Sequence, residues 1–571
     1  MDEHKNKIAE LVARTLGCAS TQVLAWIETP KDPKLGDYAL PCFLLAKERR
    51  RSPMAIATEL AASLAAPARD AGVEAVRAVG PYVNFTLDRG AFVGSTLTAI
   101  LGQGDAYGSS DVGAGKTVVV DFSSPNIAKP FGIHHLRSTV IGAAIVRLHR
   151  RLGYRVVGIN HLGDWGTQFG QLITAWQRHG DEARLDREGI PYLLELYVGF
   201  NQELATNPGL RDDARRAFAE LERGDPEARR LWKRFRDVSE AEFRRIYDLL
   251  GIQFDAFTGE SFFEDKMAPV VAELAAKGLL QESRDARIVD LTADGLGICL
   301  IQKADDSSLY VTRDLAAAMY RHATYGFTKA LYVVGGAQSL HFQQLVRVLE
   351  LLGRDFAKGV VHVPFGLMRF KDRKMSTRSG DILLLEDVLN QAVARARAIV
   401  AEKNPTLAND EGIAKAIGVG AVVFNDLKNR RVRDVVFDWA EVLAFEGETG
   451  PYVQYCHARI ASVLRKAGGK SDADLARADF TRLATDVERE LVRKTAEFGA
   501  VLTRAADACE PSFVADYLLE LGAVLNRFYI ECRILGEEPA TSDARLALVR
   551  AAQIVLKNGL AVLGLEALEE M

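Results

Sequence analysis

The sequence predicts a multidomain protein in which an α/β part, built on a parallel sheet, is followed by an all-α part. Between residues 116 and 385, short apolar runs alternate with stretches of helical spacing, which is typical of a doubly wound sheet. From residue 386 onward the strand signal fades and nearly every segment shows helical spacing. At 571 residues the chain is too long for a single hydrophobic core, because domains commonly hold roughly 100 to 200 residues.

Residues 1–110 are predicted to form a small N-terminal α/β domain. Helical spacing at 8–12 and 54–66 is followed by a strand-like run at 82–87. The next segment, GDAYGSSDVGAG at 104–115, is rich in Gly, Ser and Asp and has no apolar periodicity. Such a segment is typical of a linker, so we place the domain boundary there.

The first α/β unit of the sheet spans residues 117–159. A strand at 117–122 is followed by a polar turn, an amphipathic helix that begins near His134, and a second strand at 154–159. This order places the ligand-binding edge at the carboxyl end of the strand, where the helix N-terminus presents unpaired N–H groups and a positive dipole end. We therefore expect a phosphate group there.

The polar turn contains side chains that suit a nucleotide triphosphate. Gly132 allows close backbone approach, and Lys129, His134 and His135 could stabilise a leaving pyrophosphate. The same residues also fit a helix cap with two histidines that face solvent. Local spacing alone does not separate the two interpretations.

Later segments extend the predicted sheet domain to residue 385. Strands are expected near 287–290 and at 330–334. Charged helices at about 180–255 interrupt the alternation, which indicates an insertion in a domain that runs over 111–385.

Residues 386–571 are predicted to form a helical domain. Its first helix, 386–403, is stopped by Pro405. The net charge of -4 gives no global sign of nucleic-acid binding, so any RNA contact must come from local patches such as KNRRVR at 428–433.

The composition is that of an ordinary soluble globular protein, with 48% hydrophobic and 26% charged residues. The 6 cysteines have neither close pairs nor metal-like spacing, which favours reduced thiols and indicates no metal site. The chain lacks a charged-then-apolar leader, and its apolar runs are shorter than the roughly 18 residues of a spanning helix. We therefore expect a cytoplasmic protein without a membrane segment.

A second segment that could face phosphate is KDRKMSTRSG at 371–380, which follows the last predicted strands of the sheet. A mobile loop that carries Lys and Arg is suited to close over a triphosphate as negative charge develops on it. By itself the segment is more simply explained as a solvated charged loop.

The joint pattern is more specific than either loop. The loops at 123–137 and 371–380 occur together with HLGDWGTQFG at 161–170, YVTRDLAAAMYR at 310–321, VVGGAQSLHF at 333–342 and GPYVQYCHARI at 450–460. In this combination the chain closely resembles the arginyl-tRNA synthetases, from GDYALPCFLLAK near the N-terminus to the terminal LEEM. The resemblance implies a class I aminoacyl-tRNA synthetase with a Rossmann-type catalytic domain. It also implies an N-terminal domain that touches the tRNA elbow and a helical domain that contacts the stem and reads the anticodon.

The reaction implied by this resemblance has two steps. The carboxylate of arginine attacks the α-phosphate of ATP to give arginyl-adenylate and pyrophosphate, and the terminal ribose of tRNA(Arg) then takes the arginyl group. Family members typically need bound tRNA for the first step. The implied partners are L-arginine, ATP as a substrate and tRNA(Arg), with Mg²⁺ carried by the ATP phosphates rather than by a protein cage. Nothing in the sequence demands more than a monomer.

The resemblance also assigns an ATP site. The family's adenylation signature, usually His-x-Gly-His, falls on 132–135, where only the last histidine matches, and Lys-Met-Ser-Lys-Ser falls on 374–378 as KMSTR. The residues expected to act on the phosphates are Lys129, His135, Lys374 and Arg378, and those expected to bind the rest of ATP are Gly132, His134, Gly335, His341, Met375 and Ser376. A histidine at position 134, where the family has glycine, motivates an alternative function: a tRNA-binding paralogue with impaired adenylation.

Recognition of arginine has its own requirement, because a guanidinium is a planar fork of donors that needs a carboxylate opposite it. Asp314 is the expected partner. By resemblance the other residues of the arginine site are Asp121, Asn126, Glu260, Tyr310 and Gln338. Without the resemblance, Tyr310 and Asp314 are more simply explained as residues of a helix face, with Asp314 paired to Arg313 or Arg321.

The anticodon is expected to contact the helical domain, because unpaired bases are recognised by stacking on aromatic rings and by hydrogen bonds to their edges. The candidates are Tyr452, Gln454 and the terminal Met571, whereas Tyr455 fits base stacking and a buried core equally well. A class I ligase for a different amino acid is a further alternative, which Asp314 opposes.

Overall fold

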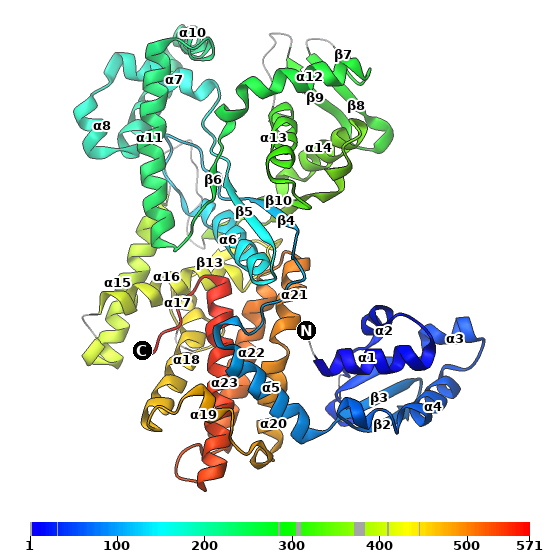
Figure 1. Cartoon of the computed structure of the whole chain (residues 1–571). Coiled ribbons are helices and arrows are strands. Elements are labelled where there is room, and N and C mark those ends of the chain that lie inside the picture. The colour runs from blue at the N-terminus through cyan, green and yellow to red at the C-terminus, as the bar shows by residue number, and fades with distance from the viewer. Residues whose placement is uncertain are drawn as a thin grey trace.

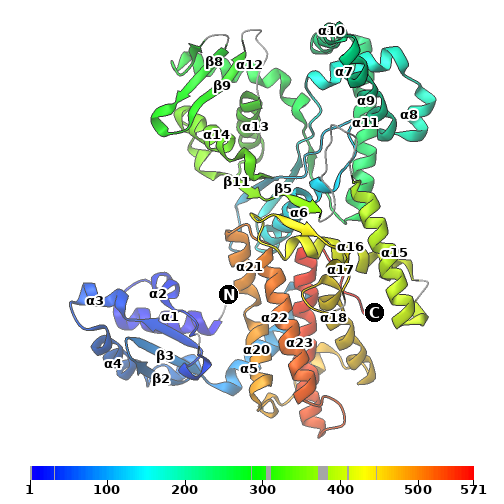
Figure 2. The same ribbon diagram turned by 180° about the vertical axis from the view of Figure 1, so that it is seen from behind.

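The structure is a computed structural model that describes residues 3–30, 32–283, 286–303, 310–370, 383–407, 410–444 and 446–571. Figures 1 and 2 show four parts: two upper lobes, a central parallel sheet with a helical bundle beneath it, and a small N-terminal domain set to one side. The predicted fold class is confirmed.

The N-terminal domain is a three-stranded antiparallel sheet, in the order β1-β3-β2, covered by helices. It has a hydrophobic core of its own, as the sequence predicts for a separate domain. Its elements are α1 (Glu3–Leu16), α2 (Ser20–Trp26), β1 (Tyr38–Pro41), α3 (Phe43–Arg49), α4 (Pro53–Leu64), β2 (Val73–Val79) and β3 (Tyr82–Leu87).

The predicted linker is packed against the rest of the molecule. Helix α5 (Arg89–Gln103) lies along the C-terminal helix α23 (Pro539–Leu563), and the Asn558 side chain donates hydrogen bonds to the carbonyls of Gly104 (3.0 Å) and Tyr107 (3.1 Å). The lack of apolar periodicity fits a segment whose only helix or strand is the short 3-10 helix Gly104–Ala106, but tertiary contacts of this kind cannot be deduced from local spacing. The domain boundary near residue 110 stays a prediction.

The central sheet has five parallel strands in the order β11-β10-β4-β5-β6. The chain builds β4, β5 and β6 outward in one direction and then returns to place β10 on the other side of β4. The topological switch point therefore lies between the carboxyl ends of β4 and β10, where open α/β sheets bind ligands. The strands are β4 (Thr117–Asp121), β5 (Arg155–Asn160), β6 (Ala256–Phe257), β10 (Lys329–Gly335) and β11 (Val360–Phe365), and α6 (Leu136–Arg151) follows β4.

The strand predicted near 287–290 exists as β8 (Ala286–Leu291), but it is not part of the parallel sheet. It pairs antiparallel with β7 (Gln281–Ser283) and β9 (Gly297–Lys303) in a separate three-stranded sheet. The alternating pattern identifies a strand, whereas its partner depends on how the chain turns in space. This small sheet lies in one upper lobe with α12 (Met267–Ala276), α13 (Tyr310–Tyr325) and α14 (Ser339–Leu351).

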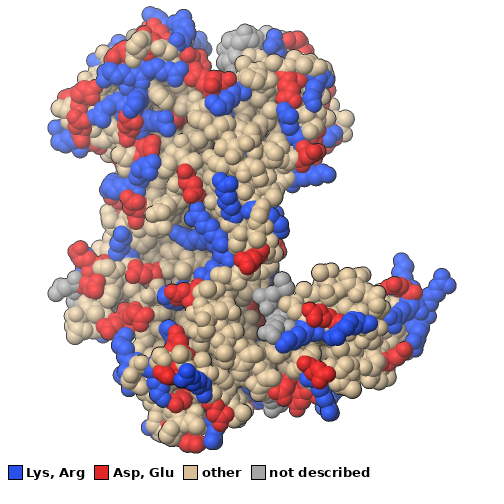
Figure 3. All heavy atoms as spheres, viewed as in Figure 1, with Lys and Arg blue, Asp and Glu red and all other residues tan. Residues whose placement is uncertain are grey.

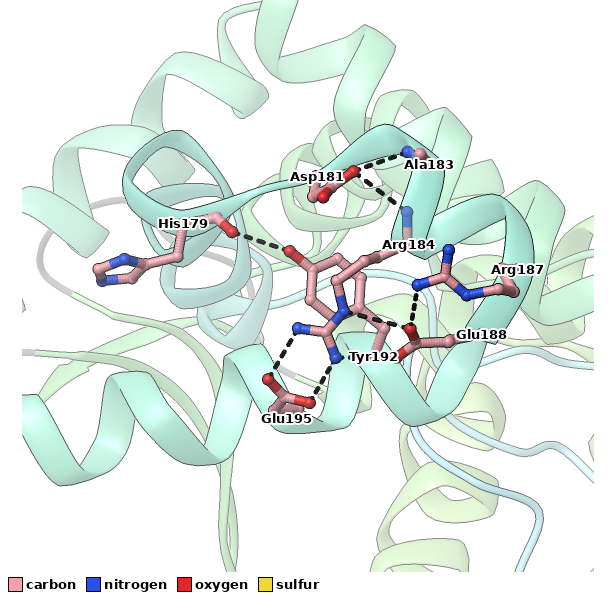
Figure 4. A network of polar contacts seen from close by, with 8 residues as sticks. All are labelled: His179, Asp181, Ala183, Arg184, Arg187, Glu188, Tyr192 and Glu195. Carbon is pink, nitrogen blue, oxygen red and sulfur yellow. Dashed lines mark hydrogen bonds and ion pairs between the residues drawn. The ribbon is translucent and has the colours of Figure 1, made fainter.

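The insertion forms the other upper lobe and begins earlier than predicted, with α7. Figure 4 shows how it is braced: Arg184 makes two parallel hydrogen bonds to Glu195 (2.8 and 3.0 Å), contacts Glu188, and lies over the Tyr192 ring at 4.2 Å. The Tyr192 hydroxyl donates to the carbonyl of His179 at 2.8 Å, which ties two helices together. The helices are α7 (Thr167–His179), α8 (Glu182–Glu188), α9 (Ile190–Thr206), α10 (Leu210–Glu222) and α11 (Pro226–Leu249).

The helical domain lies under the sheet and shares one continuous hydrophobic core with it. Its first helix, α15 (Leu385–Lys403), ends before Pro405 as predicted. The other elements are α16 (Glu411–Leu427), α17 (Trp439–Val442), α18 (Gly450–Lys466), α19 (Asp472–Leu475), α20 (Asp486–Ala496), α21 (Phe498–Asp507), α22 (Ser512–Glu531) and α23, and the short strands β12 (Met368–Phe370) and β13 (Val435–Phe437) pair in parallel.

Helix α23 is long and apolar enough to cross a membrane by length and composition, although Arg550 and Lys557 interrupt its apolar residues. Most of its apolar window is buried inside the protein, which is the position of a core helix.

A buried ion pair joins the sheet domain to the helical domain. Arg137, in the first turn of α6, donates from Nε to Asp426 of α16 at 2.8 Å, and both side chains are buried. One terminal nitrogen of the same guanidinium donates to the carbonyls of Gly366 (2.8 Å) and Arg433 (2.6 Å). Burial raises the pKa of Asp426 to about 6, and the Arg137 charge opposes that rise.

Removing one member of this pair should be costly. In Asp426→Ala the Arg137 charge stays buried without its carboxylate, so we expect a loss of about 3–5 kcal/mol of stability. The matched control is Glu570→Ala, which removes the exposed Arg465–Glu570 pair (3.1 Å). In this variant the free energy of unfolding should change by less than about 1 kcal/mol. Urea-induced unfolding of the two variants and the wild type measures both values. Equal stabilities would show that Arg137 does not need Asp426.

Candidate active site

The loop after β4 crosses the carboxyl edge of the sheet in an uncommon backbone conformation. Ser123, Ser124 and Ala128 have φ angles of 71°, 50° and 58°, in the left-handed region that non-glycine residues rarely adopt. Such strain persists only where the surrounding structure holds it, and it is frequent at functional sites.

Hydrogen bonds from three elements hold this loop. The Ser123 amide donates to the Ser138 hydroxyl of α6 at 2.9 Å, and that hydroxyl donates to the carbonyl of Val333 in β10 at 2.8 Å. The Ala128 amide donates to Ser239 of α11 at 2.8 Å. The loop is therefore fixed at the switch point between β4 and β10.

The turn at 131–135 is joined to the chain that follows the second predicted phosphate loop. The Ile133 amide donates to the carbonyl of Leu383 (3.0 Å), and the Leu385 amide donates to that of Phe131 (2.9 Å). The candidates Lys374, Met375, Ser376 and Arg378 lie outside the described residues. The chain that follows them, however, reaches the turn that contains Gly132, His134 and His135.

The two histidines of this turn differ. Burial, helped by the neighbouring His134 and Lys129, lowers the pKa of His135 to about 3, so its imidazole is neutral at physiological pH. Its Nδ1 is buried and has no hydrogen-bond partner among the described residues, which leaves one polar group available to a ligand. His134 is exposed, with its ring centroid 3.9 Å from that of His135.

Lys129 lies two residues before this turn. It is half-buried, its Nζ lies 5.8 Å from the centre of the Tyr197 ring, and burial lowers its pKa. Because His135 is neutral, Lys129 carries the positive charge that this turn can offer to a phosphate.

Three carboxylates near the switch point are paired with basic side chains of the chain itself. Two of them form the ion pairs Asp121–Arg321 (2.8 Å) and Glu260–Arg313 (3.3 Å), and the third, Asp314, is hydrogen-bonded to His341 (2.6 Å). The alternative pairing of Asp314 with Arg313 or Arg321 is therefore wrong, because those arginines hold the other two carboxylates. Burial raises the pKa of Glu260 to about 7; Arg313 opposes this rise, and Asp164 and Asp314 add to it.

The remaining candidates of the arginine site lie around these pairs. Tyr310 begins α13 and is exposed, as are Gln338 and Asn126, and Gly335 ends β10. Asp121, in contrast, is buried, and its carboxylate also accepts a hydrogen bond from Ser124 at 3.0 Å. Its position favours holding Arg321 and the loop in place.

Sequence analysis missed Asp164, which positions Glu260. The Asp164 carboxylate is fully buried and accepts hydrogen bonds from the amide and the hydroxyl of Ser261, both at 2.8 Å. The Glu260 amide donates to the carbonyl of Leu162 at 2.9 Å. An aspartate in GDWGTQFG, just past a buried strand, was the available signal.

The residues of the helical domain predicted to contact the anticodon differ in how deeply they are buried. Gln454 is 0% exposed, and its amide donates to the carbonyls of Ala416 (3.2 Å) and Glu566 (2.9 Å). The prediction that Gln454 contacts RNA directly is therefore wrong, because the side chain is hydrogen-bonded inside the core of the bundle. Tyr452 and Met571 are half-buried, whereas Tyr455 is exposed.

The basic segment 428–433 is mainly structural. The Arg431 guanidinium donates to the carbonyls of Cys509 (3.1 Å) and Pro364 (2.6 Å), so it joins the helical domain to β11. Arg433 and Val432 are exposed. On the face seen in Figure 3, Lys and Arg gather over the insertion and near α6, interspersed with acidic residues.

No group of three or more His, Cys, Asp or Glu side chains in the described part of the chain could hold a metal ion. The turn and the residues just before it thus offer a ligand the hydrogen-bonding group of His135 and the positive charge of Lys129. The carboxylates near the switch point are all paired with basic side chains.

Comparison with known families gives consistent matches along the chain. Residues 96–439 match the family model "tRNA synthetases class I (R), catalytic domain". Residues 2–87 match "Arginyl tRNA synthetase N terminal domain", and 453–571 match "DALR anticodon binding domain".

Individual proteins are similar over the full length. The arginine–tRNA ligases of Clostridium beijerinckii and an Exiguobacterium species are 48% and 49% identical over 570 residues, with 100% of both chains covered. The arginyl-tRNA synthetase structure from Thermus thermophilus has a TM-score of 0.82 at 27% identity and covers 99% of each chain. The structure from Plasmodium falciparum (TM-score 0.80, 22% identity, 100% of each chain) supports the fold.

The contact between Gly259 and Asp164 leads to a stability prediction. A Cβ on Gly259 would lie 2.5 Å from the Asp164 carboxylate, which cannot retreat without losing Ser261. We expect Gly259→Ala to cost about 1–3 kcal/mol. The control is Gly199→Ala in α9, which has nothing within 4 Å and should be neutral or stabilising by up to about 1 kcal/mol. Thermal unfolding compares the two variants, and equal Tm values would show that the Asp164 carboxylate can move away from the new Cβ at no cost in stability.

Proposed function

The chain belongs to the arginyl-tRNA synthetases, and from this premise we propose that the switch point between β4 and β10 is where arginine and ATP meet. The observation that supports this most is the placement of Asp314 and Glu260 beside one another, on the same sheet edge as the turn with Lys129 and His135. A forked cation and a polyanion can then be bound side by side.

The enzyme is an arginine–tRNA ligase that uses ATP as a substrate. Arginine's carboxylate attacks the α-phosphate, pyrophosphate leaves, and a ribose hydroxyl of the tRNA then attacks the arginyl carbonyl and releases AMP. No covalent bond to the enzyme is needed, so the protein acts by orienting the reactants and stabilising charge.

In this proposal Asp314 and Glu260 bind the guanidinium, and Tyr310, Gln338 and Asn126 border the same site. Lys129, His135 and, by resemblance, Lys374 and Arg378 act on the phosphates. Neutral His135 supplies a hydrogen bond rather than a charge, which leaves charge stabilisation to the lysines and arginine. Gly132, His134, Gly335, His341, Met375 and Ser376 are proposed around the rest of ATP.

Mg²⁺ would enter with ATP, because its preferred ligands are phosphate oxygens and water. Lys129 fits this arrangement, since its ammonium group is a donor for the phosphate oxygens that the ion leaves uncovered.

The domains on either side of the catalytic domain are proposed to bind tRNA(Arg). The N-terminal domain would contact the elbow and the helical domain the anticodon, with Tyr452 and Met571 as the retained candidates. Tyr455, which is exposed on α18, replaces Gln454 in this role, because a base can stack only on an accessible ring. We further propose a cytoplasmic monomer.

ATP–pyrophosphate exchange with arginine, with and without tRNA, tests the function. We expect exchange that depends on arginine, and a loss of at least about 100-fold in kcat/KM for arginine in Asp314→Asn, because a charged partner of the guanidinium is removed. The exposed Asp265→Asn is the matched control and should behave as wild type. No exchange under either condition would support the paralogue with impaired adenylation, and exchange with a different amino acid would support another ligase.

Glu260 predicts a pH dependence. Only its ionised form attracts a guanidinium, and its pKa in the free protein is raised to about 7. Below that pH arginine must displace a proton, so kcat/KM for arginine should fall by up to about tenfold per pH unit between pH 7 and 5.5. In Glu260→Gln this part of the pH dependence should vanish at a lower overall activity. A variant that keeps the full slope would assign the titration to another group.

A further inference from the structure

Arginine cannot bind to a free carboxylate in this structure, because the candidate carboxylates are already paired. Asp121, Glu260 and Asp314 each contact a basic side chain, and the shortest of these three contacts is Asp314 Oδ2 to His341 Nε2 at 2.6 Å. A substrate guanidinium has to exchange with one of these resident partners or share its carboxylate.

The resident partners differ in how easily they can leave. The side chains of Arg321 and Arg313 are 1% and 8% exposed, whereas His341 is 19% exposed. Moving a buried arginine would strand a charge inside the protein, which is expensive. His341 lies in the first turn of α14, and an imidazole that leaves toward solvent strands nothing.

The carboxylates differ in the same order. Asp121 is 8% exposed, Glu260 14% and Asp314 23%, so Asp314 is the most accessible of the three. The most accessible carboxylate is therefore paired with the most accessible base. The ring contact of His341 is an edge-on approach to Phe342, with 5.3 Å between ring centroids, which does not fix the imidazole in place.

We propose that His341 is hydrogen-bonded to Asp314 until arginine binds and is then displaced, so that the imidazole competes with the substrate for this carboxylate. This inference rests on the proposed function, in which Asp314 binds the guanidinium. In the absence of ATP, this competition makes the binding free energy of arginine less favourable by the free energy needed to separate His341 from Asp314.

The displaced imidazole also connects the two substrates. His341 follows Gly335 and the short turn Gly336–Gln338 at the carboxyl end of β10, where the ribose of ATP is proposed to lie. A ribose hydroxyl can donate to or accept from the imidazole that Asp314 has lost. Each substrate then removes part of the cost of binding the other, and this coupling is reciprocal.

Calorimetric titration of L-arginine into the full-length protein, without ATP or tRNA, tests the inference. We expect His341→Ala to bind arginine about threefold to tenfold more tightly than wild type, the range that corresponds to losing one competing hydrogen bond. His341→Gln, whose amide nitrogen can replace Nε2 on Asp314, should return toward the wild-type affinity. A residue with a merely structural role would weaken binding in both variants.

The matched control is His362→Ala. This second histidine lies in β11 of the central sheet, stacks on Phe342 at 4.6 Å and bonds to the carbonyl of Val334 (3.0 Å) instead of Asp314, so its loss should leave arginine affinity unchanged. A non-hydrolysable ATP analogue should tighten arginine binding to the wild type but not to His341→Ala.

Weaker or unchanged arginine binding by His341→Ala would overturn the inference. So would an ATP analogue that tightens binding equally in both proteins. A wild type that binds no arginine and shows no exchange would instead contradict the proposed function, so the two failures are distinguishable.

Discussion

The buried contact of Arg137 is the interaction on which the arrangement of the site depends. Arg137 lies two residues after the turn at 131–135, and its guanidinium binds Asp426 of α16 together with the carbonyls of Gly366 and Arg433. A single side chain thus joins α6, the end of the sheet and the helical domain. Because the charge is buried, its partners have to stay in place, and the relative position of the three elements follows.

This arrangement connects the helical bundle physically to the turn at 131–135, so a change in one can be transmitted to the other. The sheet and the helical bundle share one hydrophobic core, and Leu383 and Leu385, at the start of the helical domain, are hydrogen-bonded to the turn at 131–135. The resemblance implies that arginine is activated only when tRNA is bound. A bundle that contacts both the proposed anticodon surface and the turn is placed to transmit that requirement, since packed elements move as units.

The polar groups of the site are balanced against one another before any substrate enters. Arg321 and Arg313 form ion pairs with Asp121 and Glu260, His341 is hydrogen-bonded to Asp314, and His135 is kept neutral by burial. In the proposed function, selectivity for arginine then arises from exchange of partners at Asp314, beside the paired Glu260, rather than from an unpaired negative pocket, which would bind any cation. The substitution of histidine at 134 leaves an exposed ring beside this balanced site.

The sequence by itself determined the features that repeat locally or stand in a fixed order. Apolar spacing gave the strands β4, β5 and β10 and the helices α6, α11 and α15, and the motifs gave the family and most candidate residues. Only the tertiary structure decided the partners: Asp314 with His341 27 residues away, Arg137 with Asp426 289 away, β8 in its own sheet, and Gln454 in the core. The reason is physical, since helix and strand periods are set by neighbouring residues, whereas side-chain pairing depends on how distant elements cross and pack.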